Sequence, residues 1–223
     1  MSITGVTIND AGACEVTVVG YNAVELNMYT GKGRVKIPES VAYGGKSYRI
    51  ISLGGESICV ISANITSVTI PKTVIFFWDG AFRSKYLENI YVDEENPNFR
   101  SHDGVLFTKS LYTLIKYPSA NGRTEYNIPD ETEEIAYWSF YQCTYLEKLT
   151  IGKNVSGVGM ANGGHCYHNS KPTSGFGVIG FGGIVITGGF ERIMESLAGN
   201  GKVIVPEENE SYCQIDGIVY DAM

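Results

Sequence analysis

Three side chains that can bind metals lie close together in a glycine-rich stretch: His165, Cys166 and His168. Imidazole and thiolate groups bind zinc or copper, but a site needs three or four ligands in fixed geometry, and no fourth ligand is visible nearby. The same residues could act as a Cys–His nucleophile pair, which needs a third group to orient the base and a preorganised oxyanion site; neither is readable here. We therefore expect a loop with incidental histidines, and predict no metal site, no catalytic residue and no cofactor.

Two other kinds of segment have residue types that occur in binding sites. The run G-F-G-V-I-G-F-G-G at 175–183 is glycine-rich like a phosphate-binding loop, but it lacks the G-K-[ST] ending, and no helix start follows it. Glutamate pairs at 94–95, 133–134 and 207–208 could coordinate calcium, yet they lack the D-x-[DN]-x-[DN]-G spacing. We interpret these glutamates as solvated charges in turns.

The composition favours strands and turns over long helices. The 223 residues include 15 tyrosines and 27 glycines, and only 18% are charged. The net charge of -7 argues against a nucleic-acid partner, because such binding depends on a basic surface. No apolar run reaches the roughly 18 residues of a transmembrane helix. The five cysteines are scattered and odd in number, so they indicate neither a disulfide framework nor a zinc site.

One stretch, 128–151, contains a pattern that recurs along the chain: I-P-D-E-T-E-E-I-A-Y-W-S-F-Y-Q-C-T-Y-L-E-K-L-T-I. Its last part, L-x-x-[ILV]-x-[IV], recurs as I-T-S-V-T-I from Ile65 and as L-E-N-I-Y-V from Leu87, 22 residues further on. A period of roughly 20 to 29 residues with this motif is typical of a leucine-rich-repeat solenoid. We therefore predict a β-dominated leucine-rich-repeat solenoid: a parallel strand ladder with short turns and hairpins and little helix.

These segments resemble the BspA-type leucine-rich-repeat family, whose unit runs roughly I-P-x-x-V-x-x-I-x-x-x-A-F-x-x-C-x-x-L-x-x-I-x-I. The similarity covers about residues 35–155 and returns in V-P-E-E-N-E-S-Y-C-Q-I-D-G-I-V-Y at 205–220, which echoes 93–107. The chain departs from the family pattern at Ile58, at 83–85 and at 151–152. The resemblance implies a repeat solenoid, usually met on cell surfaces in adhesion or partner binding, and it does not imply an enzyme.

We expect residues 1–223 to form a single repeat domain. Residues 1–36 are expected to form an N-terminal hairpin cap, and 37–155 regular repeats with a hairpin insertion at 93–127. Residues 156–223 are expected to form degenerate C-terminal repeats or a cap, because 156–190 holds 11 of the 27 glycines and has little clear period. Within this last part we predict strands at 182–187 and 202–206 and a two-turn helix at 191–200.

The core is expected to consist of stacked Ile, Leu and Val rows with aromatic side chains between them. Phe82, Trp138 and Phe140 stand at the aromatic positions of the repeats. Cys59 and Cys143 occupy similar points of two repeats, and we expect both to be small buried apolar residues.

The exposed side of the strand ladder is the predicted binding surface. In L-x-x-I-x-I the apolar residues point inward and the residue between the last two points outward. The predicted partner-binding residues are the outward ones and their neighbours: Ser67, Thr69, Asn89, Tyr91, Lys148 and Thr150. Solenoids use such rows as recognition surfaces, and tyrosine among small polar residues suits that use. The alternative is an ordinary solvated sheet.

For function we expect a non-catalytic cell-surface or secreted interaction or adhesion module that binds a protein or glycan ligand on host or matrix. The alternative is a hydrolase or metal-dependent enzyme with its site in the irregular 156–190 coil. The start, M-S-I-T-G-V-T-I-N-D, lacks the segments of a signal peptide, so either the chain is not exported or it begins after a removed signal. We favour the second.

Overall fold

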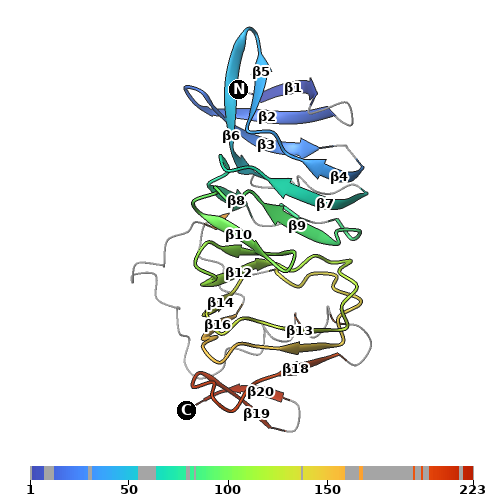
Figure 1. Ribbon diagram of the computed structural model, residues 1–223, viewed down its shortest axis with the longest axis vertical. Coiled ribbons are helices and arrows are strands. Elements are labelled where there is room, and N and C mark those ends of the chain that lie inside the picture. The colour runs from blue at the N-terminus through green and yellow to red at the C-terminus, as the bar shows by residue number, and fades with distance from the viewer. Residues whose placement is uncertain are drawn as a thin grey trace.

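The computed structural model describes residues 2–7, 13–29, 32–54, 64–78, 81–82, 84–136, 138–158, 166–167, 193, 197, 201–215 and 218–222. These residues form an elongated stack of short strands, with the N-terminus near one end and the C-terminus near the other (Figure 1). Within them, helical backbone is confined to Ile193. The predicted β-dominated solenoid is confirmed.

One side of the solenoid consists of two parallel ladders. Val35, Val68 and Ile90 stand in register in the first ladder, and Tyr126, Leu149 and Val203 in the second. All six are buried, so each strand stacks its central side chain on the next. The strands of the first ladder are β4 (Gly33–Lys36), β7 (Ile65–Ile70) and β9 (Asn89–Val92), and those of the second are β13 (Glu125–Asn127), β15 (Lys148–Thr150) and β18 (Lys202–Ile204).

The opposite side of the coils carries further parallel pairs, which the repeat pattern did not predict. They are β3 (Ala23–Tyr29), β6 (Lys46–Leu53) and β8 (Phe76–Trp78), and then β12 (Thr113–Lys116), β14 (Glu134–Ile135) and β16 (Gly157–Val158). A further strand, β17 (Cys166–Tyr167), pairs with β8 in the antiparallel direction. Several of these strands have only two or three residues, too few for a recognisable alternation.

The N-terminal part is antiparallel. β1 (Ser2–Thr7), β2 (Ala13–Gly20) and β3 form two successive antiparallel pairs, and β5 (Ser40–Tyr43) pairs with β6. The turn between β5 and β6 places Gly44 and Gly45 at φ of 57° and 74°, a conformation that glycine adopts without steric cost. The range 1–36 expected for the cap also contains β4, which already pairs in parallel with β7.

A hairpin interrupts the regular coils in the middle of the stack. β10 (Phe99–His102) and β11 (Val105–Thr108) are antiparallel and turn through Asp103 and Gly104. Phe99 and Leu106 pack in the N-terminal core, whereas Val105 and Phe107 pack in the C-terminal core. The rest of the predicted insertion, 93–127, contains β12 and β13, which are members of the parallel ladders.

The end of the chain repeats this hairpin, as the echo of 93–107 in 205–220 suggested. β19 (Tyr212–Ile215) and β20 (Ile218–Asp221) are antiparallel. The structure also contains the predicted strand at 202–206, as β18. Ile193 and Leu197 are buried, in agreement with an apolar face of the expected helix, but most of 191–200 and the strand expected at 182–187 lie outside the described residues.

The aromatic side chains fill the core as predicted at two of three positions. Phe82 and Phe140 are buried, and the Phe140 ring stacks on Tyr117 with centroids 5.3 Å apart. Cys143 is also buried, and this desolvation raises the pKa of its thiol to about 12. Cys59 lies outside the described residues.

The prediction for Trp138 was wrong. Its side chain is 40% exposed, and its backbone has a φ of 61°, in the left-handed region. The turn that starts at Trp138 directs the indole outward, where it packs edge-on against Tyr141 at 4.6 Å, and Phe140 takes the core position instead.

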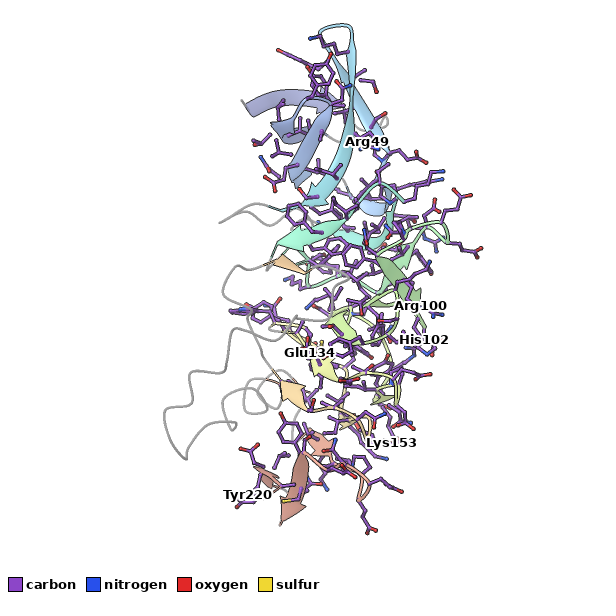
Figure 2. The ribbon with its side chains drawn as sticks, turned by 90° about the vertical axis from the view of Figure 1, so that its left-hand side faces the viewer. Arg49, Arg100, His102, Glu134, Lys153 and Tyr220 are labelled. Atoms are coloured by element: carbon purple, nitrogen blue, oxygen red, sulfur yellow. The ribbon has the colours of Figure 1, made fainter. Side chains whose placement is uncertain are left out.

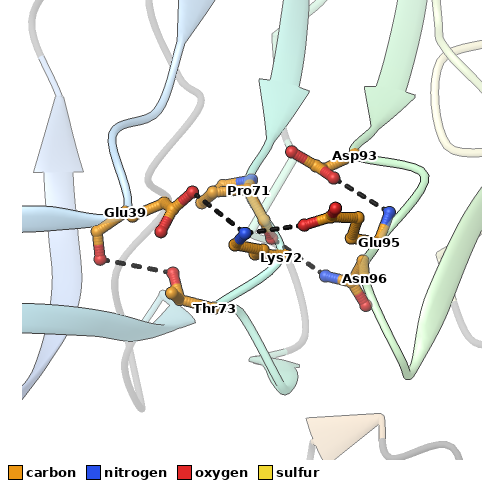
Figure 3. Close-up of polar contacts among 7 residues, drawn as sticks. All are labelled: Glu39, Pro71, Lys72, Thr73, Asp93, Glu95 and Asn96. Atoms are coloured by element: carbon orange, nitrogen blue, oxygen red, sulfur yellow. Dashed lines mark hydrogen bonds and ion pairs between the residues drawn. The ribbon is translucent and has the colours of Figure 1, made fainter.

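Two buried asparagines, Asn96 and Asn209, each join two neighbouring coils of the stack by an equivalent set of hydrogen bonds. Asn96 Nδ2 donates to the carbonyl of Pro71 at 2.9 Å (Figure 3) and to that of Val74 at 3.0 Å. Its Oδ1 accepts from the N–H groups of Asn98 and Phe99. Each asparagine stands just before one of the two hairpins and satisfies backbone groups of the preceding coil.

Asn209 makes the equivalent bonds before the second hairpin. Its Nδ2 donates to Gly152 O (3.1 Å) and Val155 O (2.9 Å), and its Oδ1 accepts from the N–H groups of Ser211 and Tyr212. The amide is needed at both positions because it supplies two donors and an acceptor from one side chain.

Replacing Phe140 by alanine should lower the free energy of unfolding by about 3–5 kcal/mol, because the substitution opens a cavity against Tyr117. Urea denaturation followed by tryptophan fluorescence measures this change. Tyr145→Ala, at a side chain that is 55% exposed, is the control and should change stability by less than about 0.5 kcal/mol. A loss below about 1 kcal/mol for Phe140→Ala would contradict the described packing.

Asn96→Asp should destabilise the protein by at least about 2 kcal/mol, because a carboxylate would face two carbonyl oxygens and leave them without a donor. Asn127→Asp makes the same charge change at an exposed position and serves as the matched control. Equal unfolding midpoints for the two variants in urea would show that the Asn96 bonds do not hold the coils together.

A candidate binding face on the strand ladders

The two ladders on one side of the solenoid each present a set of outward side chains, and we call the two sets together the strand face. In each strand the central residue is buried and the residues on either side of it point away from the core. The strand face consists of Arg34, Lys36, Ser67, Thr69, Asn89, Tyr91, Glu125, Asn127, Lys148, Thr150, Lys202 and Ile204.

In the first ladder the register aligns these side chains in two rows. One row is Arg34, Ser67 and Asn89, and the other is Lys36, Thr69 and Tyr91. Tyr91 is 49% exposed, whereas Ser67 is only 9% exposed and offers little surface. The structure thus brings four of the six residues predicted from the sequence into one ladder.

The second ladder aligns Glu125, Lys148 and Lys202 in one row and Asn127, Thr150 and Ile204 in the other. Lys148 Nζ lies 3.1 Å from Glu125 Oε2, an exposed ion pair of small energetic weight. The predicted residues Lys148 and Thr150 are therefore neighbours of each other, in a different ladder from the other four.

The tip of the β10–β11 hairpin contacts the last strand of the first ladder. The Ile90 N–H donates to Gly104 O at 2.9 Å, and Ser101 Oγ donates to Ile90 O at 2.5 Å. Gly104 has a φ of 78°, which favours glycine, and a Cβ at this position would lie 2.5 Å from Asn89 Oδ1 and displace that side chain. Asn89 is consequently half-buried under the hairpin.

The L-x-x-I-x-I motif did not predict three basic residues of the strand face: Arg34, Lys36 and Lys202. Their strands lack the leading Leu or Ile of the L-x-x-I-x-I motif. A usable signal was nevertheless present, since V-K-I-P at 35–38 and V-I-V-P at 203–206 end in proline like V-T-I-P at 68–71. Arg34, Lys36 and Lys202 are all exposed.

The turns that follow the strands form a second, differently charged surface, the turn edge (residues 38–39, 71–73, 93–96, 129–130, 152–154 and 206–209). Its lysines are paired with carboxylates of neighbouring coils: Lys72 Nζ lies 2.6 Å from Glu95 and 3.9 Å from Glu39 (Figure 3). The hydrogen bond and charge of Glu95 raise the pKa of Lys72. Unlike the strand face, this edge carries many acidic residues.

Lys153 makes the corresponding pair further along, 3.2 Å from Asp130, and its side-chain hydrogen bond lowers the pKa of that carboxyl. Figure 2 shows Lys153 on the same side of the stack as Arg100 and His102 of the hairpin.

The glutamate pairs differ from one another. Glu94, Glu95, Glu207 and Glu208 are exposed in turns, as predicted. Glu134, in contrast, lies in β14, where it accepts a hydrogen bond from Thr113 Oγ1 at 3.2 Å; the prediction that it is a free turn charge was wrong. Burial and the nearby Glu134 raise the pKa of Tyr112 to about 12.

The His165, Cys166 and His168 cluster falls mainly outside the described residues, which include the Cys166 backbone in β17 but neither histidine. Among the residues that are described, no group of three or more His, Cys, Asp or Glu side chains could hold a metal ion. In the same part of the chain, no helix has the length and apolar character needed to cross a membrane.

Comparison with solved structures gives bacterial leucine-rich-repeat proteins. The pneumococcal vaccine antigen PcpA is 17% identical (68% of this chain, 66% of that one, TM-score 0.39). A leucine-rich repeat protein from Eubacterium ventriosum is 17% identical (70% and 62%, TM-score 0.42), and a leucine rich cell surface protein from Faecalibacterium prausnitzii is 14% identical (70% and 72%, TM-score 0.39). The match covers less than two thirds of the first two chains. Since the TM-scores are below 0.5, the fold assignment rests on the strand ladders.

Among curated proteins no match is found. The family model described as BspA type Leucine rich repeat region (six copies) matches residues 117–162. This range contains the whole repeat unit at 128–151 and the strands β13 to β16, so the match falls on regular coils of the solenoid. Residues 117–162 therefore match BspA-type leucine-rich repeats, as the resemblance in the sequence predicted.

Proposed function

We propose that this protein is a non-catalytic interaction module that binds a protein or glycan ligand, on a host cell or matrix, through the strand face. The observation that carries the proposal is the arrangement of that face. Tyrosine, amide, hydroxyl and charged side chains stand in rows, exposed or half-buried, on either side of buried central residues. Repeat proteins use extended surfaces of this kind for recognition.

The strand face is rigid, which favours binding. Val68 and Ile90 beneath it are fully buried, and the backbone of β7 is bonded to strands on both sides. A surface that is already ordered loses little conformational entropy when a ligand binds. Tyr91 adds contact area with few rotatable bonds.

The repeat family supports the rest of the proposal. BspA-type repeats are usually met on cell surfaces in adhesion or partner binding, so we place this protein at the cell surface or in the secreted fraction. We also treat residues 1–223 as one repeat domain, because the β10–β11 hairpin contributes side chains to both cores.

The triple variant Asn89→Ala, Tyr91→Ala, Lys148→Ala should lose binding to any ligand of the strand face, because it removes contacts from both ladders. Ligands are first identified by probing the wild-type chain against immobilised matrix proteins and a glycan array. Affinity for each hit is then measured by biolayer interferometry, with an expected loss of about tenfold or more, equivalent to about 1.4 kcal/mol.

The matched control is Asn22→Ala, Tyr43→Ala, Lys46→Ala, which removes the same three residue types from exposed positions in the N-terminal antiparallel part. Circular dichroism checks that both triple variants are folded. If the strand-face variant binds every hit as tightly as the control does, the face is not the binding surface.

A further inference from the structure

The strand face has the opposite charge to the rest of the protein, and from this we infer that its ligand is an extended anionic polysaccharide, one bearing sulfate or carboxylate groups. This inference rests on the proposed function and specifies the class of ligand. Four cationic side chains occupy the strand face, against one acidic residue, Glu125, which forms an ion pair with Lys148. The whole chain has a net charge of -7, so the acidic residues are concentrated elsewhere.

The cations are placed at both ends of the row of strands. Arg34 and Lys36 are outward residues of β4, the first strand of the first ladder. Lys148 and Lys202 are aligned neighbours in β15 and β18, the last two strands of the second ladder. Because hydrogen-bonded strands are about 4.8 Å apart and the two pairs lie in different ladders, a ligand that contacts both pairs must extend across several strands.

The side chains between the two pairs suit a sugar chain. Thr69, Asn89, Asn127 and Thr150 are uncharged, and their hydroxyl and amide groups can both donate and accept hydrogen bonds, as sugar hydroxyls do. Tyr91, half exposed beside Thr69, adds an aromatic ring with a polar tip. The rows therefore combine cations toward the two ends with mainly neutral polar side chains between them, the exception being Glu125, which is paired with Lys148.

An acidic peptide fits this face less well. Extended peptides gain affinity mainly through main-chain hydrogen bonds to a free sheet edge. On the strand face, the central strands β7 and β15 already use their backbone groups with the strands on both sides, so a peptide backbone would find no partners there. Nucleic acid is also disfavoured, because its dense phosphates require a more basic surface than four cations around a glutamate.

The test compares dextran sulfate with unsulfated dextran of the same length, since the two polymers differ only in charge. The wild-type protein should bind dextran sulfate, show no binding to dextran, and bind more weakly as NaCl rises from about 0.05 M to about 0.5 M. Arg34→Gln, Lys36→Gln, Lys148→Gln, Lys202→Gln should weaken the binding by about tenfold or more.

A control variant separates the strand face from net charge. Lys46→Gln, Arg49→Gln, Lys72→Gln, Lys153→Gln removes one arginine and three lysines from exposed positions outside the strand face and should bind like the wild type. Equal losses in the two variants would overturn the inference, because they would show a general effect of charge. Binding of poly-glutamate or single-stranded DNA as tight as that of dextran sulfate would overturn the choice of a polysaccharide.

The inference and the proposed function can fail separately. If dextran sulfate does not bind, but an array or matrix ligand loses affinity in the Asn89, Tyr91 and Lys148 triple variant, the strand face is a binding surface for a ligand that is not an anionic polysaccharide. If that ligand is also unaffected, both proposals are wrong.

Discussion

Each coil of this protein can bury its apolar side chains only against the coils above and below it. Val68 is covered by Val35 on one side and Ile90 on the other, and Leu149 is covered in the same way by Tyr126 and Val203. The parallel hydrogen bonds fix this alignment, and a shift of one residue would turn the buried side chains toward solvent. The positions on the strand face are therefore determined by the core: once Val68 is buried, Thr69 must point outward.

Stacking also explains why charges separate onto two surfaces. The strand face is made of single residues between buried ones, and it carries four cations and one acid. The turn edge is made of loops, where acidic residues hydrogen-bond to neighbouring backbone, as Asp93 accepts from the Glu95 N–H at 2.9 Å. Lysines on that edge pair with carboxylates of adjacent coils, and Lys148 of the strand face pairs with Glu125 in the same way.

The parts of the fold that could be predicted are those with local physical signals. The L-x-x-I-x-I motif located β7, β9 and β15. The short strands β14 and β16 have two residues each, so their pairing is decided by the coils around them rather than by their own sequence. Trp138 was misplaced because its left-handed backbone, not its apolar character, sets its direction. Six residues of the strand face were predicted from the motif, namely Ser67, Thr69, Asn89, Tyr91, Lys148 and Thr150. The flanking Arg34, Lys36 and Lys202 were not predicted, because their strands depart from the motif.

The β10–β11 hairpin has a consequence for how the molecule unfolds. In a simple solenoid each coil contacts only its neighbours, so coils can peel away from one end while the others stay folded. Here neighbouring residues of β11 point into different cores: Leu106 packs in the N-terminal core and Phe107 in the C-terminal core. Loss of this hairpin would expose both cores at once. We therefore expect the insertion to couple the two halves of the solenoid, so that they unfold together rather than coil by coil.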